Sequence, residues 1–129
     1  MIVVDASVIV TGLGDDGDEG DRVRVRLRTE RLVAPHVIDL EVVSAGRRLV
    51  AAGHLDERRA TLALADLGSL RLERVTHGPL MDRCWELRDN LTVYDAAYVA
   101  LAELMEVDLL TADARLAAAP GIRCRVEVL

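Results

Sequence analysis

The sequence predicts one α/β domain, in which a central and largely parallel sheet is flanked by helices. Short apolar segments alternate along the chain with longer segments of helical periodicity, which is the order of a parallel sheet with crossover helices. The chain has 129 residues, of which 51% are hydrophobic. That length is typical of a single domain, here residues 1–129. No linker, repeat or low-complexity segment divides the chain.

Five segments have the pattern of strands, because they are short, apolar or alternating, and bounded by turn residues. They are residues 1–5, 31–34, 70–75, 108–111 and 123–129. The first of them, MIVVD, is a continuous apolar run that ends in an acid. Such a run is typical of a parallel strand that is buried on both faces.

Seven segments predict helices. They are residues 7–13, 22–30, 36–52, 56–67, 79–89, 92–105 and 115–119. We expect Ser7 to cap the first helix and residues 12–21, which are rich in glycine and aspartate, to form a solvated loop after it. We expect Gly53 and Gly68 to end the third and fourth helices.

Two of the predicted helices have informative faces. The helix at 36–52 has one apolar stripe at helical spacing, made of Ile38, Val42, Ala45, Leu49 and Ala52. The helix at 92–105 contains the sequence AAYVALAEL and is apolar on nearly every side. A helix of this kind is usually buried, so we expect an acid in its first turn to have a specific role and not to be a solvated surface charge.

Composition argues against several classes of protein. The chain has 22 acids and 16 bases, all arginine, for a net charge of −6 and a pI near 5.0, which does not suit a protein that coats nucleic acid. One tryptophan and two tyrosines are too few for a base-stacking platform. Cys84 and Cys124 cannot form a disulfide framework or a four-cysteine zinc site. Without a membrane-spanning run or a secretory signal, we expect a cytoplasmic protein.

Four acids occupy positions where a ligand site can form. Asp5 ends the first strand, and Asp113 follows the strand at 108–111. In open α/β sheets, ligands bind at the carboxyl ends of the strands, near the point where the strand order reverses. Asp95 lies in the first turn of the apolar helix, and Glu41 lies about 60° from the centre of the apolar stripe at ~100° per residue. Together they are candidates for one crevice.

Each of these acids also has a purely structural interpretation. Asp95 follows Thr92 at capping-box spacing, Asp113 can cap its short helix, and Asp5 lies near a helix N-terminus. Glu41 can simply be solvated. If all four converge within ~5 Å, however, each pair repels by roughly 3 kcal/mol at an effective dielectric near 20. Such a cluster needs raised pKa values or a hard divalent cation, and oxygen ligands suit Mg²⁺ or Mn²⁺.

Four motifs contain these acids. In chain order they are MIVVDASV at the N-terminus, P-x5-E at 35–41, LTVYDAAYVALAE at 91–103 and LLTADARL at 109–116. Together they resemble PIN-domain ribonucleases, and most closely the VapC toxins of bacterial type II toxin–antitoxin modules. The resemblance covers essentially the whole chain, and the last two motifs are the most specific. It implies a three-layer PIN-like fold with a parallel sheet between helices.

The resemblance also implies an endoribonuclease that depends on Mg²⁺ or Mn²⁺. The residues that match the family's catalytic and metal-holding positions are Asp5, Glu41, Asp95 and Asp113. Ser7 and Thr111 match positions that support the acids or the bound water. The implied partners are an RNA substrate such as tRNA or rRNA, a VapB-like antitoxin across the acidic cleft, and a second copy of the chain, with no membrane. Arginines at 22–31 are candidates to fix the RNA backbone.

Other α/β classes fit the residues less well. A phosphoacceptor receiver domain needs a lysine at a late strand end, and this chain has no lysine. A haloacid-dehalogenase-type phosphatase needs a second acid two residues after the first, where this chain has Ser7. The remaining alternative is a catalytically inactive PIN-like module that binds a partner protein or RNA.

Overall fold

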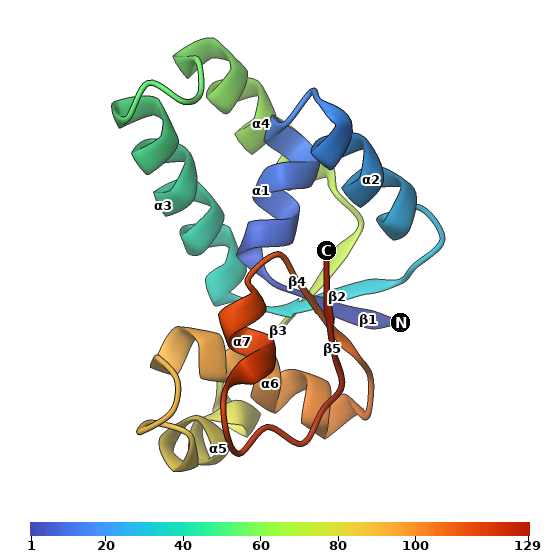
Figure 1. Cartoon of the computed structure of the whole chain (residues 1–129), viewed down its shortest axis with the longest axis vertical. Helices are drawn as coiled ribbons and strands as arrows, with labels where there is room; N and C mark the ends of the chain where they lie inside the picture. Colours follow the sequence, from blue (N-terminus) through green and yellow to red (C-terminus); the bar gives the residue numbers. More distant parts are fainter.

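The computed structural model describes residues 1–129 and contains one sheet of five parallel strands (Figure 1). The strands are β1 (Ile2–Val4), β2 (Leu32–Pro35), β3 (Leu72–Val75), β4 (Leu109–Thr111) and β5 (Val126–Val128). Their order across the sheet is β3-β2-β1-β4-β5. Val3 of the central strand β1 pairs with Val33 of β2 on one side and with Leu109 of β4 on the other. All five predicted strands are therefore present.

Seven α-helices and one 3-10 turn connect the strands. They are α1 (Ala6–Gly14), α2 (Asp18–Leu27), α3 (Val37–Ala51), α4 (Glu57–Ser69), η1 (Gly78–Leu80), α5 (Met81–Glu86), α6 (Val93–Met105) and α7 (Ala114–Ala118). Helices α1 and α2 lie on one side of the sheet, and α5 and α6 lie on the other (Figure 1). Helices α3 and α4 pack against α1 and against each other, and reach beyond the sheet as a two-helix arm, the α3–α4 arm.

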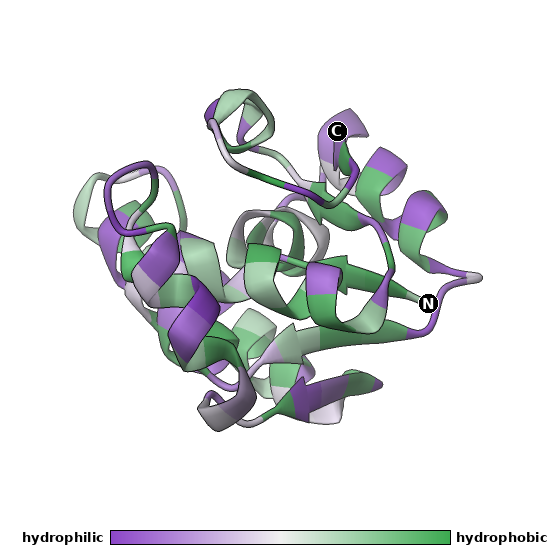
Figure 2. Ribbon diagram, turned by 90° about the horizontal axis from the view of Figure 1, so that it is seen from below, coloured by the Kyte–Doolittle hydropathy of each residue, from purple (hydrophilic) through white to green (hydrophobic).

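The core is built around β1 and α6. Every residue of β1 is buried, and so is every residue of α6 from Ala96 to Ala102. The prediction that this helix is buried on nearly all sides is thus confirmed. In Figure 2 the inner strands of the sheet have the colour of hydrophobic residues, while hydrophilic residues appear on the edge strand β3 and on the outer helices. No helix combines the length and the apolar character that a membrane crossing requires.

Some element boundaries differ from the predictions. Asp5, not Ser7, caps α1, because its Oδ1 accepts a hydrogen bond from the Val8 N–H at 3.2 Å. Gly68 lies within α4 and does not end it, whereas Gly53 adopts a left-handed conformation just after α3, as expected. The predicted helix at 79–89 is divided into η1 and α5.

The apolar stripe of α3 is only partly buried. Ile38 and Val42 lie in the core, but Ala45 and Leu49 are half-buried and Ala52 is exposed. The first half of α3 contains its two buried residues, whereas the second half extends into the α3–α4 arm. The second half of the stripe is therefore free to line a cavity.

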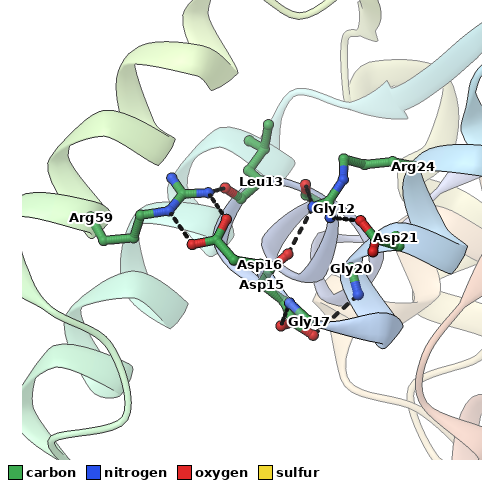
Figure 3. A network of polar contacts seen from close by, with 9 residues as sticks. All are labelled: Gly12, Leu13, Asp15, Asp16, Gly17, Gly20, Asp21, Arg24 and Arg59. Atoms are coloured by element: carbon green, nitrogen blue, oxygen red, sulfur yellow. Dashed lines mark hydrogen bonds and ion pairs between the residues drawn. The ribbon is translucent and has the colours of Figure 1, made fainter.

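The predicted solvated loop at 12–21 is wrong, because only residues 15–17 separate α1 from α2. Figure 3 shows the reason. Asp15 Oδ1 accepts from the Gly17 N–H at 2.8 Å, and its Oδ2 accepts from the Gly20 N–H at 3.1 Å. Arg24 Nη1 donates to the carbonyl oxygens of Gly12 at 3.0 Å and Asp15 at 2.7 Å. A Cβ on Gly20 would lie 1.9 Å from the Asp15 carbonyl oxygen, so the tight turn requires glycine there.

Arg59 of α4 connects this turn to the α3–α4 arm (Figure 3). Its Nε and Nη2 donate to the two carboxylate oxygens of Asp16 at 3.1 and 3.0 Å. Its Nη2 also donates to the Leu13 carbonyl oxygen at 2.7 Å. These bonds hold α4 against the C-terminal end of α1 and so fix the position of the arm.

The strand order reverses between β1 and β4. From β1 the chain continues outward through β2 and β3, and it then returns to place β4 and β5 on the other side of β1. Asp5 directly follows β1, and Asp113 lies two residues beyond the end of β4. The carboxyl ends of adjacent parallel strands share one sheet edge, so this is where a ligand crevice is expected.

Candidate functional site

The four predicted acids line one cavity of about 450 Å³ at this edge of the sheet. Its walls come from α1, α3 and α6 and from the residue that precedes α7. The polar side chains that line it belong to Asp5, Ser7, Thr11, Glu41, Arg48, Asp95, Tyr98 and Asp113. A larger hollow of about 1040 Å³ lies beside α2, β2 and β3 and contains none of the four acids. The smaller cavity is therefore the candidate site.

Asp5 is the most deeply buried acid of the site, with 7% of its surface exposed. Its Oδ1 accepts hydrogen bonds from Ser7 Oγ at 2.5 Å and from the Val8 N–H at 3.2 Å, and its Oδ2 accepts one from the Thr111 hydroxyl. Burial raises the pKa of Asp5, although these hydrogen bonds oppose the rise. Three donors thus fix both oxygens of a carboxylate that is costly to ionise.

Ser7 and Thr111 connect Asp5 to the segment that follows β4. Ser7 Oγ accepts from the Ala112 N–H, and Thr111 Oγ1 accepts from the Asp113 N–H, both at 3.0 Å. Because each hydroxyl also donates to Asp5, the two side chains bridge the carboxyl ends of β1 and β4. Both have the contacts that a supporting residue needs.

Glu41 enters the cavity from α3. Its Oε1 accepts a hydrogen bond from the Tyr98 hydroxyl of α6 at 2.5 Å. Burial raises the pKa of Glu41, and the charges of Asp95 and Asp5 raise it further. Burial and the bond to Glu41 also raise the pKa of Tyr98. Sequence reasoning missed Tyr98, although it lies three residues after Asp95 and so on the same helical face.

Asp95 is half-buried at the start of α6 and does not cap it. Thr92 is the cap, since its Oγ1 accepts from the Asp95 N–H at 3.1 Å, and the Asp95 carboxylate makes no reciprocal bond to the Thr92 N–H. Burial raises the pKa of Asp95, and the charge of Asp113 adds to the rise. The carboxylate of Asp95 therefore faces the site without a helix-capping role.

Asp113 has two roles at once. It caps α7, with its Oδ1 accepting from the Arg115 N–H at 3.0 Å, and it also lines the cavity. Arg115 Nε and Nη2 donate to its two carboxylate oxygens at 3.1 and 3.0 Å. This guanidinium lowers the pKa of Asp113. The structural interpretation of Asp113 as a cap is thus correct, and Asp5 caps α1, but neither role excludes a place in the site.

The donor set of the cavity fits a hard divalent cation. The four acids and the hydroxyls of Ser7 and Thr11 offer only oxygen ligands, which suit Mg²⁺ or Mn²⁺. The acids do not, however, form the close cluster that was expected, because no three His, Cys, Asp or Glu side chains are arranged as they would be around one metal ion. The chemistry of the residues therefore fits the cation. The Asp113 carboxylate forms an ion pair with Arg115.

Arg48 is the only basic side chain among the residues that line the cavity. Sequence reasoning missed it, although it lies seven residues after Glu41 and hence on the same face of α3. None of the arginines at 22–31 lines the cavity, so any contact that they make with the RNA backbone would lie outside it. Helix α2 packs on α1 beside the larger hollow, where Arg24 binds the turn and Arg26 pairs with Glu127.

The cysteines and histidines lie outside the site. Cys84 is buried, Cys124 is half-buried, and neither forms a disulfide. The three histidines are exposed, as expected, and none of them lines the cavity. One of them has a structural role, since His77 Nε2 accepts from the Val37 N–H at 3.0 Å at the start of α3.

Comparison with known proteins gives consistent matches over the whole chain. The family model that describes the PIN domain matches residues 2–122. Ribonuclease VapC1 of Mycobacterium tuberculosis is 43% identical over 128 residues, which are 98% of this chain and 96% of that protein. Among solved structures, PAE2754 from Pyrobaculum aerophilum has a TM-score of 0.70 at 24% identity, with 91% of this chain and 82% of that chain covered. VapBC2 from Rickettsia felis, bound to a promoter DNA fragment, has a TM-score of 0.68 at 13% identity, with coverage of 99% and 98%.

Proposed function

The chain belongs to the PIN domain family and, within it, to the VapC ribonucleases, and we propose that it is an endoribonuclease toxin that cleaves RNA with the help of Mg²⁺ or Mn²⁺. One observation carries this proposal. Four acids that are spread over residues 5–113, each within a motif of the family, line a single cavity at the strand-order reversal. The substrates that we propose, tRNA or rRNA, place the activity in the cytoplasm.

The carboxylates have the chemistry to hold the cation. Asp5 and Asp95 are the central ligands in our proposal, with Glu41 and Asp113 completing the set. When bound, such a cation stabilises charge on the phosphate and lowers the pKa of a water molecule. Burial raises the pKa values of Asp95 and Glu41, and the repulsion between acids that raises them further would be relieved by the cation.

The residues of the chain orient the reacting groups. Tyr98 fixes the rotamer of Glu41, and a half-buried carboxylate with a raised pKa is suited to orient the attacking water and accept its proton. Asp113 is the other candidate for this role once Arg115 releases it. Ser7 and Thr111 keep Asp5 in a single orientation, which preserves the geometry of the site.

We also propose two protein partners. A VapB-like antitoxin can close the cavity with an arginine, which would pair with the carboxylates and compete with the metal. A second copy of the chain can cover the apolar surface on α5 and α6, where Met81, Trp85 and Tyr94 are each at least 60% exposed. Light scattering of the chain alone and with its antitoxin tests both partners.

Cleavage of bulk tRNA and rRNA by the antitoxin-free protein tests the proposed activity. The reaction is run with Mg²⁺ or Mn²⁺, with EDTA, and with the variants Asp95→Asn and Asp89→Asn. Asp89 is exposed and lies outside the cavity, so the second variant makes the same charge change as a control. We expect cuts at discrete sites that EDTA and Asp95→Asn abolish and that Asp89→Asn leaves unchanged.

The alternative function is a catalytically inactive module. A folded chain that neither cleaves these RNAs nor binds the metal would favour that alternative. Isothermal titration with Mg²⁺ and Mn²⁺ provides the metal-binding measurement. Cleavage that persists in EDTA would contradict the metal dependence while leaving the nuclease assignment in place.

A further inference from the structure

We propose that Arg48 is an RNA-positioning residue, whose guanidinium binds a backbone phosphate of the substrate at the rim of the acidic cavity. This inference rests on the proposed function, because it names a residue that holds the RNA at that same site. It concerns binding of the substrate and assigns Arg48 no part in the chemical step.

The position of Arg48 follows from the geometry of α3. Glu41, Ala45 and Arg48 are spaced by four and then three residues, so they form one row along the helix, and all three line the cavity. Glu41 lies at the deep end of this row and is half-buried, whereas Arg48 lies two turns further along and is exposed. The guanidinium can therefore reach a ligand that enters the cavity from solvent.

Arg48 is not neutralised by the chain. Eight of the sixteen arginines form ion pairs with carboxylates, and Arg48 is not among them. Its only side-chain hydrogen bond runs from Nη1 to Ser44 Oγ at 2.9 Å, one turn earlier on α3. An arginine has five N–H donors in a planar fork that matches phosphate oxygens. Most of these donors are free for a ligand.

The negative charge around the cavity makes an arginine at its rim favourable for binding RNA. Four carboxylates line it, and the chain has a net charge of −6, so a polyanion is repelled from the site. Arg48 is the arginine of the α3–α4 arm that lines the cavity, and it places one positive charge directly beside the four carboxylates.

The arm is held in place rather than hinged. Arg59 binds Asp16 and the Leu13 carbonyl oxygen, and these three bonds fix α4 to the end of α1 (Figure 3). Helix α3 is in turn packed against α4 and α1. The position of the Arg48 backbone beside the cavity is therefore set by the fold before the RNA arrives, which lowers the entropic cost of binding.

A structural role is the main competing explanation. Arg48 lowers the pKa of Glu41 through its charge, so it could serve only to balance that carboxylate. The two side chains form no ion pair, however. A purely structural role would change stability and leave the salt dependence of RNA binding unaltered, so the two explanations can be separated by measurement.

The experiment measures RNA binding by fluorescence polarisation, with a labelled random-sequence single-stranded RNA in EDTA, from about 50 to 200 mM salt. Arg47 provides the matched control, since it is the adjacent arginine of α3, is exposed, and does not line the cavity. We expect Arg48→Ala to weaken binding about tenfold and to reduce the slope of log affinity against log salt by about 0.7. Arg48→Lys restores the slope, and Arg47→Ala changes affinity less than twofold.

Kinetics on a cleaved RNA give a second, independent reading. We expect Arg48→Ala to raise KM with little change in kcat, because a phosphate contact away from the reacting atoms contributes uniform binding. The inference is overturned if Arg48→Ala binds RNA with the affinity and salt slope of the unaltered chain, if Arg47→Ala loses as much, or if the unaltered chain binds no RNA. An effect of Arg48→Ala on antitoxin binding alone would also overturn it. RNA that is bound through Arg48 but never cut would contradict the proposed function and leave this inference standing.

Discussion

The Tyr98 hydroxyl donates a hydrogen bond to Glu41 Oε1 at 2.5 Å, and this bond joins the buried helix α6 to the first half of α3. Tyr98 is 1% exposed, whereas Glu41 is half-buried. The bond therefore connects the core of the domain to one wall of the acidic cavity. The Glu41 carboxylate is in this way held by a side chain of the buried helix α6.

Tyr98→Phe should reduce cleavage while leaving the fold intact. Loss of a buried hydrogen bond to a charged group costs about 1–2 kcal/mol of stability, and loss of an outer-shell partner typically costs 10–100-fold in activity or metal affinity. Urea unfolding and kcat/KM measure the two effects. Tyr94→Phe is the control, because Tyr94 is also on α6 but is 60% exposed. Equal activity of the two variants would show that the bond does not position Glu41.

Asp95→Asn should stabilise the chain in metal-free buffer. Burial and the charge of Asp113 raise the pKa of Asp95, so the ionised carboxylate is unfavourable in the folded state. Its removal should raise the free energy of unfolding by roughly 0.5–1 kcal/mol, once solvent screening of this half-buried group is allowed for. Thermal unfolding in EDTA measures the change, with Asp89→Asn as the control. A loss of stability would indicate a structural role for Asp95.

In Mg²⁺ the unaltered chain should become more stable than the Asp95→Asn variant. The cation binds the folded chain through the acids and so raises the melting temperature of the unaltered protein as its concentration increases. Asp95→Asn removes a ligand, and its melting temperature should respond to Mg²⁺ far less. Differential scanning fluorimetry across a Mg²⁺ titration gives the comparison. An equal response of both proteins would mean that the metal binds elsewhere.

In EDTA, Asp5, Glu41 and Asp95 should make a contribution to stability that grows as the pH falls towards the ordinary pKa values of these carboxyl groups. The pKa values of Asp5, Glu41 and Asp95 are raised above their ordinary values of 3.8, 4.5 and 3.8. A raised pKa contributes stability that is fully present below the unfolded value and is lost as the pH rises through the folded value. Asp113 has a lowered pKa, and its contribution is lost only as the pH falls below about 3.8. The melting temperature should depend less on pH when Asp95→Asn and Glu41→Gln are combined.

Gly20→Ala should be the most damaging glycine substitution in the α1–α2 turn. Its Cβ would lie 1.9 Å from the Asp15 carbonyl oxygen, and the backbone must move to relieve the clash, at a cost of about 2–3 kcal/mol. Gly46→Ala is the control, because it lies within α3 and its Cβ meets nothing within 4 Å. That variant should gain about 0.5–1 kcal/mol. Chemical denaturation of both proteins checks the opposite signs.

The fold could be predicted from the sequence because its elements differ strongly in pattern. Apolar runs such as IVV and the apolar segment of α6 have no polar face, so they are expected in the core, and both are buried there. The prediction failed at residues 12–21, where glycine and aspartate have low helix propensity. There the bonds of Asp15 and Arg24 outweigh propensity, and Asp18, Glu19 and Asp21 are favourable in the first turn of α2.

The site could be predicted only in part. Asp5 and Asp113 follow parallel strands, so one rule of sheet geometry brings them to the same edge. Helical spacing places Tyr98 on the face of Asp95 and Arg48 on the face of Glu41, but the bond between Tyr98 and Glu41 depends on how α3 and α6 are placed in the fold, which no local pattern encodes. The arginines at 22–31 looked suitable because of their number, but the packing of α2 against α1 places them on the far side from the cavity.

The bond between Thr111 and Asp5 joins residues that are 106 positions apart, and β1 becomes the middle of the sheet only when β4 pairs with it. A ribosome that makes this chain therefore synthesises the first acid of the site long before the last one. Until residue 113 has been added and has emerged, the nascent polypeptide has no acidic cavity. The acidic cavity, which we propose to be the nuclease site, is therefore completed only towards the end of synthesis.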